Sequence, residues 1–549
     1  MSQLKNNFNN IFFCNFECLF FNNKHYIVCF TIMPLLKTTP HIFKSDILLN
    51  SQLTDIDSIS LDLLEFFIKS IFELSKSKTN YFIFHNLKRF DFFYILSILS
   101  NTYKVDIIIK NDIIYSVCII FGDKKIFFRD SFLLFPDSIC FFYDSFLSKR
   151  QKFISISFFF KLNLLKNCEQ DTFFLCKAFN SYMLLFYNEF KINILNSLTF
   201  SSLSLYIFIN KFYNATLYSV LPLKKSAEIF IRKAYFGGSC DLFSSFLPYG
   251  FHYDANSLYP YVMKYFDMPI GNFEIVSIDA DFDINTFFGF IEIEANLPKD
   301  IKIPFLSLLN KSVFFSEEVK YALTLGYNIK FKKAYKFDKG CPFVDFVDFF
   351  YLRRFFFKKK KNPLNKIFKL ILNSLYGKLG MHTDFDIMQI VHKSKTLDIN
   401  KILSMHNVKT FEYISEDFIL AIYSKEISLE KLYFLSDKDS NNLSKNLNAK
   451  FYNTTKFNNS VHFSCSIASY ARIEIYKYKL LFYKSLFYSD TDSLFLDKEI
   501  PSIFFSNTIL GAMKLEEVVY DCNFFSPKNY SYYNSFSTDI RIIKGKSNI

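Results

Sequence analysis

The chain has 549 residues, and half of them are hydrophobic, which is enough apolar side chain for about two to four domains. Its formal net charge of +13 favours a polyanionic partner such as nucleic acid, with a membrane surface as the alternative. No uncharged run is apolar enough to predict a transmembrane helix, the eleven cysteines contain no CxxC pair, and no secretory signal or mitochondrial presequence is visible. These features argue against a membrane-embedded protein, a secreted protein and a Cys-rich zinc site.

Up to about residue 210, short β-rich runs alternate with helical stretches such as 61–74, which predicts an α/β domain. The β-rich runs are 26–32, 81–85, 105–109, 115–121 and 125–128. Beyond about residue 230, strands and helices alternate less regularly. A helix is predicted over 316–325, with Ser316 as its N-cap and Gly326 as its end.

A carboxylate stands at the end of an aromatic strand in the segment Gly250-Phe-His-Tyr-Asp-Ala-Asn-Ser-Leu-Tyr-Pro260. Pro260 prevents this segment from continuing as a central strand, so Asp254 is delivered close to a strand end. A single Asp in that place is commonly a cap. Asp254 alone therefore does not identify a site.

Two more carboxylates lie in Leu486-Phe-Tyr-Ser-Asp-Thr-Asp-Ser-Leu-Phe-Leu496, where apolar runs flank a polar centre. The pattern predicts a tight hairpin with Asp490 and Asp492 at its tip. Two acids so close raise each other's pKa, and an arrangement that keeps both ionised calls for a bound cation. A solvated turn rich in Asp and Ser is the alternative.

A helix is predicted from Asn362-Pro363, as N-cap and first helical residue, through Tyr376. At 100° per residue, Lys369, Asn373 and Tyr376 fall on one face, and the apolar residues gather on the other. A cation, an amide and an aromatic ring on one face could bind a nucleoside triphosphate. An ordinary amphipathic helix with a solvated polar face is the alternative.

Together, these segments resemble the three polymerase motifs of family B DNA polymerases, in the family's order. The motifs are Asp254-Ala-Asn-Ser-Leu-Tyr-Pro260, Lys369-Leu-Ile-Leu-Asn-Ser-Leu-Tyr-Gly377 and Tyr488-Ser-Asp-Thr-Asp-Ser493. Tyr235-Phe-Gly-Gly238 is similar to the family's linker motif between exonuclease and polymerase domains, and Lys528-Asn-Tyr530 to its Lys-x-Tyr motif. The resemblance is to the protein-primed members carried by bacteriophages and by linear plasmids of fungal and plant mitochondria.

The resemblance implies a two-metal catalytic centre built from Asp254, Asp490 and Asp492. Asp254 and Asp492 would bind the two ions, with Asp490 beside them. We expect Mg²⁺, because a site of carboxylates, waters and phosphate oxygens suits a hard cation. Two such ions can lower the pKa of the primer 3′-hydroxyl and stabilise the leaving pyrophosphate.

The resemblance also implies contacts to nucleotide and DNA. The carbonyl of Ala255 would be a further metal ligand, and Lys369, with Asn373 on the same face, would neutralise the triphosphate. Tyr259 would exclude a ribose 2′-hydroxyl, and Tyr376 would pack against the nascent base pair. The residues that would contact DNA are Tyr235, Gly237, Gly238, Thr491, Lys528, Tyr530, His85 and Asn86.

The amino-terminal domain resembles the proofreading exonuclease of the same family. Tyr81-Phe-Ile-Phe-His-Asn-Leu-Lys-Arg-Phe-Asp91 is similar to its second motif, with Asp91 as a metal ligand. The first motif should read Asp-x-Glu, and its candidate is Asn15-Phe-Glu17. Asp130-Ser-Phe-Leu-Leu134 resembles a weaker family segment, with a plain turn as the alternative.

The third exonuclease motif should end in an acid, and the aligned segment 175–179 ends in Phe179. A shift of a few residues would instead bring Asp171 or Glu189 into the site. With the first alignment, only Asn15, Glu17 and Asp91 remain as an exonuclease remnant. We therefore expect proofreading to be absent or severely weakened, because an amide and a phenyl ring supply no charge to a two-metal site.

The expected fold is mixed α/β, with a ribonuclease H-like 3′–5′ exonuclease domain followed by a right-hand polymerase with palm and fingers and a short or absent thumb. The expected domains are a degenerate exonuclease-like domain (1–210), a first part of the palm with an insertion that binds a priming protein (211–345), the fingers (346–400), a second part of the palm (401–530) and a thumb remnant (531–549).

The function indicated is that of a DNA-directed DNA polymerase that replicates a linear plasmid or similar element. Its expected partners are primer–template DNA, deoxynucleoside triphosphates and a separate terminal priming protein, and we expect a monomer. Abundant Phe (75) and scarce Gly (12) indicate an AT-rich genome and, with the resemblance, a mitochondrial location. The alternatives are a catalytically decayed remnant that only binds nucleic acid and a membrane-surface protein, and the latter explains none of the motifs.

Overall fold

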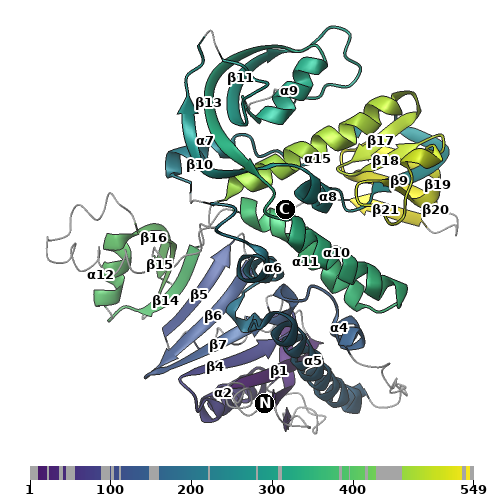
Figure 1. The fold of residues 1–549 in the computed structure, drawn as a ribbon. Coiled ribbons are helices and arrows are strands. Elements are labelled where there is room, and N and C mark those ends of the chain that lie inside the picture. Colours follow the sequence, from purple (N-terminus) through teal and green to yellow (C-terminus); the bar gives the residue numbers. More distant parts are fainter. Residues whose placement is uncertain are drawn as a thin grey trace. The chain divides into compact units, whose positions relative to one another are not determined.

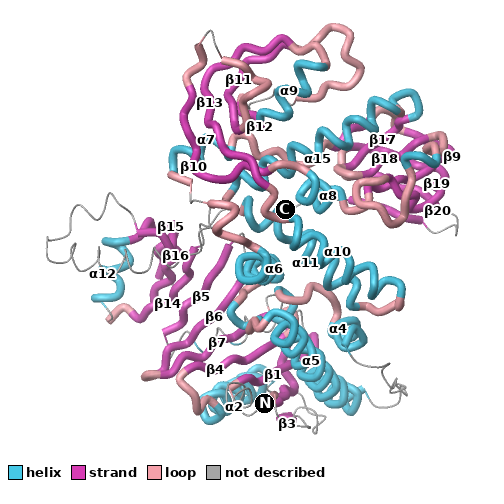
Figure 2. The backbone as a smooth tube through the Cα atoms, in the orientation of Figure 1, coloured by secondary structure: helices cyan, strands magenta, loops and turns pink. Residues whose placement is uncertain are grey.

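The computed structural model describes residues 10–21, 24–35, 41–44, 56–87, 95, 99, 104–110, 113–146, 160–220, 223–279, 282–306, 312–381, 386–394, 396–413, 418–427, 460–534 and 539–543. The chain divides into two compact units. Unit 1 comprises Met1–Ile207, Phe355–Ile367 and Thr383–Asn453, and unit 2 comprises Phe208–Arg354, Phe368–His382 and Thr454–Ile549. Figure 1 labels the elements in chain order, and Figure 2 separates helices from strands by colour.

In the described part of unit 1, ten strands form one sheet in the order β15-β16-β14-β5-β6-β7-β4-β1-β2-β3. Every β-rich run expected before residue 210 is a strand of this sheet. The elements of the unit are β1 (Ile11–Phe21), β2 (Lys24–Pro34), β3 (His41–Lys44), α2 (Ile56–Leu74), β4 (Thr79–Phe84), β5 (Lys104–Lys110), β6 (Ile113–Phe121), β7 (Lys124–Asp130), α4 (Ile139–Phe146), α5 (Phe160–Phe190), α6 (Phe200–Ile207), β14 (Asp386–His392), α12 (Thr396–Met405), β15 (His406–Tyr413) and β16 (Phe418–Ile427).

Alternation along β1 explains how the two long helices of unit 1 pack. Phe12, Cys14 and Phe16 share one face of the strand and join the core that includes the apolar side of α2. Phe13 lies on the opposite face, where its ring contacts Phe179 of α5 at 5.6 Å. The next side chains on this second face are Asn15 and Glu17, so the strand turns its polar pair toward α5.

Strands β14, β15 and β16 lie in a different part of the fold from the one expected. Residues 386–400 were expected in the fingers and 401–427 in the palm, but β14 pairs antiparallel with β5, from Asp386↔Ile109 to Ile390↔Val105. Buried Gln389 adds a hydrogen bond to Asp106 at 2.7 Å. This ladder attaches the segment to the sheet of unit 1.

In the described part of unit 2, seven strands form an antiparallel sheet in the order β21-β20-β19-β9-β18-β17-β8, and four form a second sheet in the order β10-β13-β11-β12. The elements are α7 (Lys225–Arg232), β8 (Cys240–Leu242), β9 (Phe246–Ala255), α8 (Leu258–Tyr265), β10 (Met268–Val276), β11 (Gly289–Asn296), β12 (Val313–Phe315), α9 (Ser316–Thr324), β13 (Asn328–Gly340), α15 (Val461–Leu481), β17 (Leu486–Asp490), β18 (Ser493–Leu496), β19 (Met513–Ser526), β20 (Asn529–Asn534) and β21 (Asp539–Ile543). Helices α10 (Val344–Lys359) and α11 (Leu364–Gly380) carry residues of both units.

The segment expected to be a thumb remnant extends the seven-stranded sheet. Strand β20 pairs with β19, and β21 pairs with β20 along Asn529↔Ile543 to Tyr533↔Asp539. Alternate residues of β20, among them Tyr530 and Tyr532, enter the aromatic core of this sheet with Tyr488 and Phe495. Burial of these rings explains why the described residues after Lys528 form strands of the seven-stranded sheet.

The smaller sheet lies within the insertion expected to bind a priming protein, and α9 packs on it. The predicted helix start is wrong by one residue. The N-cap is Phe315, and Ser316 is already helical and fully buried. The Ser316 hydroxyl accepts the Gly289 backbone N–H at 3.1 Å, so it serves β11 rather than the helix end. Gly326 follows the helix with φ +87°, as expected for its end.

Among the described residues, no helix is both long and apolar enough to span a bilayer.

Candidate active site

Two strand ends bring Asp254 and Asp492 together. The predicted hairpin is present, with Asp490 paired to Ser493 across β17 and β18. Strand β18 pairs antiparallel with β9, and Ser493 lies opposite Asp254. The Ala255 N–H donates to the Asp492 carbonyl at 2.8 Å, which ties the hairpin turn to the end of β9. The long-range ladder thus places the acid of the first motif beside those of the third.

The two carboxylates form an electrostatically costly pair. Burial, followed by the charges of Asp492 and Glu516, raises the pKa of Asp254 to about 7, against the opposing effect of Lys369 and Lys514. Burial and Asp490 raise the pKa of Asp492. Two half-buried carboxylates that repel each other favour a proton or a cation between them. Their oxygen donors suit a hard divalent ion such as Mg²⁺.

Asp490 has a different partner. The Lys528 ammonium donates to Asp490 Oδ1 in a short ion pair, and the Thr491 hydroxyl donates to the same oxygen at 3.0 Å. The Lys528 backbone N–H donates to the hydroxyl of Tyr488 at 2.6 Å. Among the described residues, no group of three or more His, Cys, Asp and Glu side chains is arranged to hold a metal ion. Asp254 and Asp492 therefore form one carboxylate pair, and Asp490 forms an ion pair with Lys528.

The polar face of α11 lies as predicted from its periodicity. The Asn362 side chain accepts the Leu364 N–H at 2.9 Å and caps the helix. Lys369 is exposed, whereas Ile367 and Ile371 are fully buried. Lys369 lowers the pKa of both Asp254 and Asp492, so its ammonium faces the carboxylate pair. The helix thus presents a cation to the acids.

Tyr259 and Tyr376 stack on each other with ring centroids 4.2 Å apart and an interplanar angle of 3°. Burial raises the pKa of both phenols, so both are neutral near pH 7. The Ser464 hydroxyl donates to the Tyr376 carbonyl in a short hydrogen bond and helps to hold α11 in place. On the same face, Asn373 has a buried Oδ1 without a hydrogen-bond partner. This amide oxygen and the two rings are available to a ligand that separates the stack.

Arg354 was not singled out from the sequence, where it is one cation in the run 353–361. Its Nη1 donates to the Ser257 hydroxyl at 2.6 Å. Burial lowers its pKa, and the charges of Glu516 and Asp254 oppose this. Arg354 is thus a second cation near the acids. The sequence feature that could have identified Arg354 is an arginine in a run that is rich in lysines. Arginine is favoured where a cation is partly buried.

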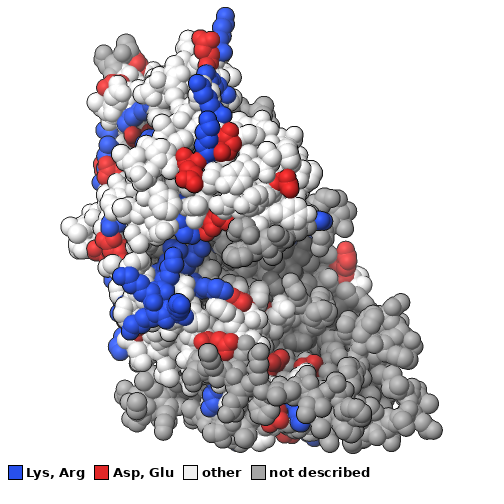
Figure 3. Space-filling view, turned by 90° about the vertical axis from the view of Figure 1, so that its right-hand side faces the viewer, with Lys and Arg blue, Asp and Glu red and all other residues white. Residues whose placement is uncertain are grey.

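The lysines that follow Arg354, residues 358–361, are exposed. Figure 3 shows Lys and Arg side chains gathered in one dense group at the level of the α10–α11 turn of Figure 1. Such a group suits a phosphate backbone.

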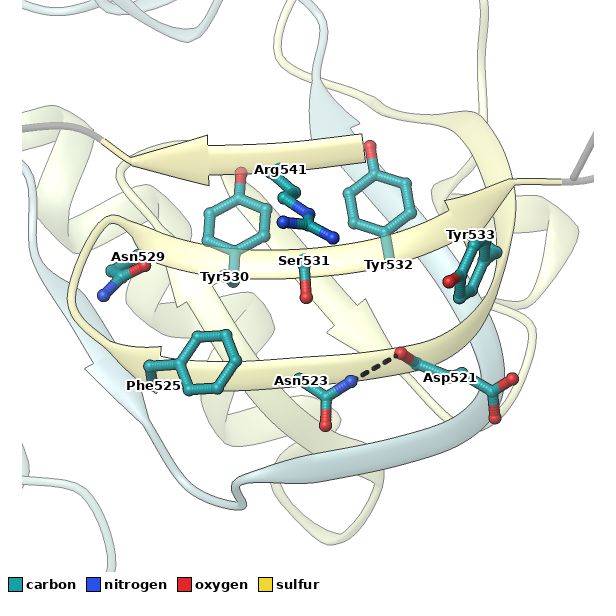
Figure 4. A pocket seen from close by; sticks show the side chains of 9 residues that line it. All are labelled: Asp521, Asn523, Phe525, Asn529, Tyr530, Ser531, Tyr532, Tyr533 and Arg541. Carbon is teal, nitrogen blue, oxygen red and sulfur yellow. Dashed lines mark hydrogen bonds between the residues drawn. The ribbon is translucent and has the colours of Figure 1, made fainter. Parts of the chain in front are cut away.

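Tyr530, expected at the primer end, is mostly covered. Its ring packs 5.1 Å from Tyr488 and 5.4 Å from Phe495, and 7% of the residue is exposed. It also lines a hollow of about 450 Å³ on β19, β20 and β21 (Figure 4). Of the Lys528-Asn-Tyr530 motif, Lys528 therefore contacts the turn at Asp490 and Thr491. Tyr530 packs against Tyr488, whose hydroxyl accepts the Lys528 backbone N–H.

The acid that lies near Glu17 in the exonuclease-like site is Asp171, whereas the sequence alignment placed Phe179 there. Phe179 is fully buried and packs against Phe13. The acid facing β1 is Asp171, one of the two alternatives considered. Burial, followed by the charge of Asp171, raises the pKa of Glu17 to about 7, and burial raises the pKa of Asp171 to about 6. The register in which α5 packs against β1 places Asp171, and not Phe179, near Glu17.

The other exonuclease-motif residues have partners within unit 1. Both ring nitrogens of His85 are hydrogen-bonded, to the Ser131 hydroxyl at 2.9 Å and the Asp137 carbonyl at 2.8 Å. The Asn86 N–H donates to Asp130 at 2.7 Å. Burial lowers the pKa of His85 to about 4, so its ring is neutral. Asp91 lies outside the described residues.

The fold is that of a right-hand polymerase with an exonuclease-like domain. The structure matches phi29 DNA polymerase complexed with primer-template DNA and incoming nucleotide substrates, with a TM-score of 0.69 at 18% identity over 98% of this chain and 92% of that one. Phi29 DNA polymerase complexed with single-stranded DNA gives the same TM-score at 17% identity over the same shares of the two chains. At these identities the likeness concerns the fold.

Residues 72–154 and 159–484 match the family described as DNA polymerase type B, organellar and viral, and since this is more than half of the chain, the chain belongs to that family. A probable DNA polymerase of Neurospora intermedia is 28% identical over 69% of this chain and 38% of its own length. One of Agaricus bitorquis is 29% identical over 68% of this chain and 49% of its own length. The chain thus spans half or less of the length of these relatives.

Proposed function

We propose that this chain is a DNA-directed DNA polymerase that extends a primer by nucleotidyl transfer at Asp254 and Asp492. The observation that carries the proposal is the pair of half-buried carboxylates facing Lys369 of α11, with the pKa of Asp254 raised to about 7. A structural pair of acids without a ligand would only destabilise the fold. Family membership supports the same reaction.

The residues of the site have separate tasks in this reaction. Asp254 and Asp492, with the carbonyl of Ala255, would hold two Mg²⁺ ions, which supply charge neutralisation at the primer 3′-hydroxyl and the leaving pyrophosphate. Lys369 and Arg354 neutralise the triphosphate oxygens. Lys528, which forms an ion pair with Asp490, offsets part of the charge that this third acid exerts on Asp492.

Tyr259 and Tyr376 act on the sugar and base of the nucleotide. Their stacked rings contact each other face to face, so an incoming base and sugar must separate them. Tyr376 then offers its ring to the new base pair, and Tyr259 occupies the volume that a 2′-hydroxyl would need. Asn373 Oδ1, which has no partner, can accept a hydrogen bond from the nucleotide.

The biological setting is also a proposal. Resemblance to protein-primed enzymes supports replication of a linear plasmid or similar element in a mitochondrion, with primer–template DNA and a priming protein as partners of a monomer. The four-stranded sheet with α9 is the element we assign to the priming protein. Tyr235, Gly237, Gly238, Thr491, Lys528 and Tyr530 remain the residues assigned to DNA in the polymerase unit.

Primer extension with purified protein, Mg²⁺ and deoxynucleotides tests the catalytic assignment. Asp254→Asn and Asp492→Asn should each reduce incorporation by at least about a thousandfold and leave primer–template affinity within a few-fold, because the acids act on the transition state and duplex affinity comes from spread phosphate contacts. Asp300→Asn, the same change at an exposed turn, is the matched control. Near-normal extension by either active-site variant would refute the assignment. DNA binding without extension by the wild type would favour the decayed remnant.

A further inference from the structure

The turn that carries the catalytic acids is strained. Thr491 has φ +62°, a left-handed conformation that is unusual for a β-branched residue. The Asp492 N–H donates back to the Asp490 carbonyl at 2.7 Å, which closes a three-residue turn around Thr491. A conformation of this kind persists only where its surroundings hold it.

Those surroundings include the segment 236–239, which we call the glycine strap. The Thr491 N–H donates to the Ser239 carbonyl at 2.9 Å. A Cβ on Gly238 would lie 2.6 Å from Thr491 Cγ2 and 3.0 Å from its Cα, so only glycine allows this approach. Gly237 differs, since a Cβ there would meet nothing within 4 Å.

Helix α15 fastens the strap on both sides of Gly238. On the amino-terminal side, Arg472 Nη1 donates to the carbonyls of Phe236 at 2.7 Å and Gly237 at 3.1 Å. The same guanidinium is oriented by two hydrogen bonds of 2.8 Å to buried Glu318. These contacts fix the position of the glycine strap relative to α15.

On the carboxyl-terminal side, Lys479 is 1% exposed. Its ammonium donates to the Ser239 hydroxyl at 2.7 Å and to Asp241 at 2.6 Å. Arg472 and Lys479 are seven residues apart and therefore lie on the same face of α15. Strand β8 follows directly and pairs with β17, with Cys240 opposite Asp490.

We propose that Gly238, Arg472 and Lys479 are positioning residues that hold the strained turn at Thr491, and through it Asp490 and Asp492, in register with Asp254. This rests on the proposed polymerase function and adds to the assignment of Gly237 and Gly238 to DNA. None of the contacts requires DNA. The two glycines are thereby separated in role, because Gly238 supports the acids and Gly237 is open to a ligand.

Gly238→Ala and Gly237→Ala form a matched pair for the test. Gly238→Ala should lower the turnover number at saturating nucleotide by at least about tenfold, because displacements of about 1 Å misalign reacting groups. Its nucleotide KM and primer–template Kd should stay within about threefold. Gly237→Ala, at a residue assigned to DNA, should weaken primer–template binding and should lose much less of the turnover measured at saturating DNA. Equal losses in both variants, accompanied by weaker DNA binding, would overturn the proposal.

A second substitution tests the contact itself. Thr491→Ser removes Cγ2, the atom closest to the added Cβ, and keeps the hydroxyl that binds Asp490. Introduced into Gly238→Ala, it should restore a substantial part of the turnover that Thr491→Ser alone retains. Absence of any recovery would mean that the loss does not arise from the contact with Thr491 Cγ2.

Amide hydrogen exchange gives a readout without substrate. In metal-free protein, peptides covering 486–496 should exchange faster in Gly238→Ala and in Lys479→Met than in wild type, and Gly237→Ala should match wild type. Unchanged exchange in both variants would refute the proposal that the glycine strap holds the turn at Thr491. Failure of the polymerase function has a different signature, because Asp254→Asn would then extend primers normally. Failure of the positioning proposal alone would leave Asp254→Asn inactive and Gly238→Ala active.

Discussion

Asp254→Asn should stabilise the metal-free protein at neutral and alkaline pH while abolishing synthesis. Burial and the neighbouring carboxylates raise the pKa of Asp254 from 3.8 to about 7 in the folded state. Between these values the folded protein holds a proton that the unfolded chain has released, so the wild type loses stability as the pH rises. The loss at this residue is complete once the pH exceeds the folded pKa.

The magnitude follows from the size of the shift. Each pKa unit corresponds to about 1.4 kcal/mol, so the upward shift costs the wild type about 4 kcal/mol above about pH 8. Asparagine has no proton to release. The unfolding free energy of Asp254→Asn minus that of wild type should therefore increase by about 3 kcal/mol from about pH 5 to about pH 8.

Urea unfolding in the presence of EDTA, analysed by linear extrapolation at each pH, measures this difference. Taking the difference between two proteins cancels the titration of groups that do not interact with residue 254, such as Glu17 and Asp171. A flat difference for Asp254→Asn, or a variant less stable than wild type at about pH 8, would refute the electrostatic account of the pair.

Three further outcomes are expected. Tyr259→Val should raise the ratio of ribonucleotide to deoxyribonucleotide incorporation, because exclusion by volume disappears with the ring, and an unchanged ratio would remove Tyr259 from sugar selection. Lys369→Met should raise the KM for deoxynucleotides by about tenfold or more through the lost charge-assisted contact, with the same change at Lys366, which pairs with Asp137 at 3.8 Å, as the matched control. Release of mononucleotides from 3′-labelled single-stranded DNA should be weak, because Asn15 brings no charge to the exonuclease-like site. The remaining release should disappear in Asp171→Asn and persist in Glu189→Gln. Rapid release by the wild type would show that the site tolerates Asn15.

The features that sequence analysis predicted well depend on short stretches of chain. The apolar and polar faces of α11 follow from helical periodicity, and the hairpin that carries Asp490 and Asp492 follows from apolar runs around a polar centre. The Asn362 cap needs only neighbouring residues. Backbone geometry repeats within a few residues, so a short stretch of sequence is enough to predict such features.

Other features depend on which segments meet, and periodicity does not encode that. Asp171 rather than Phe179 faces Glu17 because of the register of α5 on β1, and Ser316 serves a neighbouring strand instead of its helix end. The pairing of β14 with β5 attaches residues 386–390, which were expected in the fingers, to the sheet of unit 1. Each of these depends on contacts between residues far apart in the chain.

The sequence by itself determined the family resemblance, the identity of the acids and the side of α11 that carries Lys369. Only the tertiary structure decided that Asp490 pairs with Lys528, that Arg354 lies near Asp254, and that Gly238 must lack a side chain against Thr491. The physical reason is that charge pairing, desolvation and close packing depend on distances in space. Those distances arise only when the strand ladders and α15 bring remote segments together.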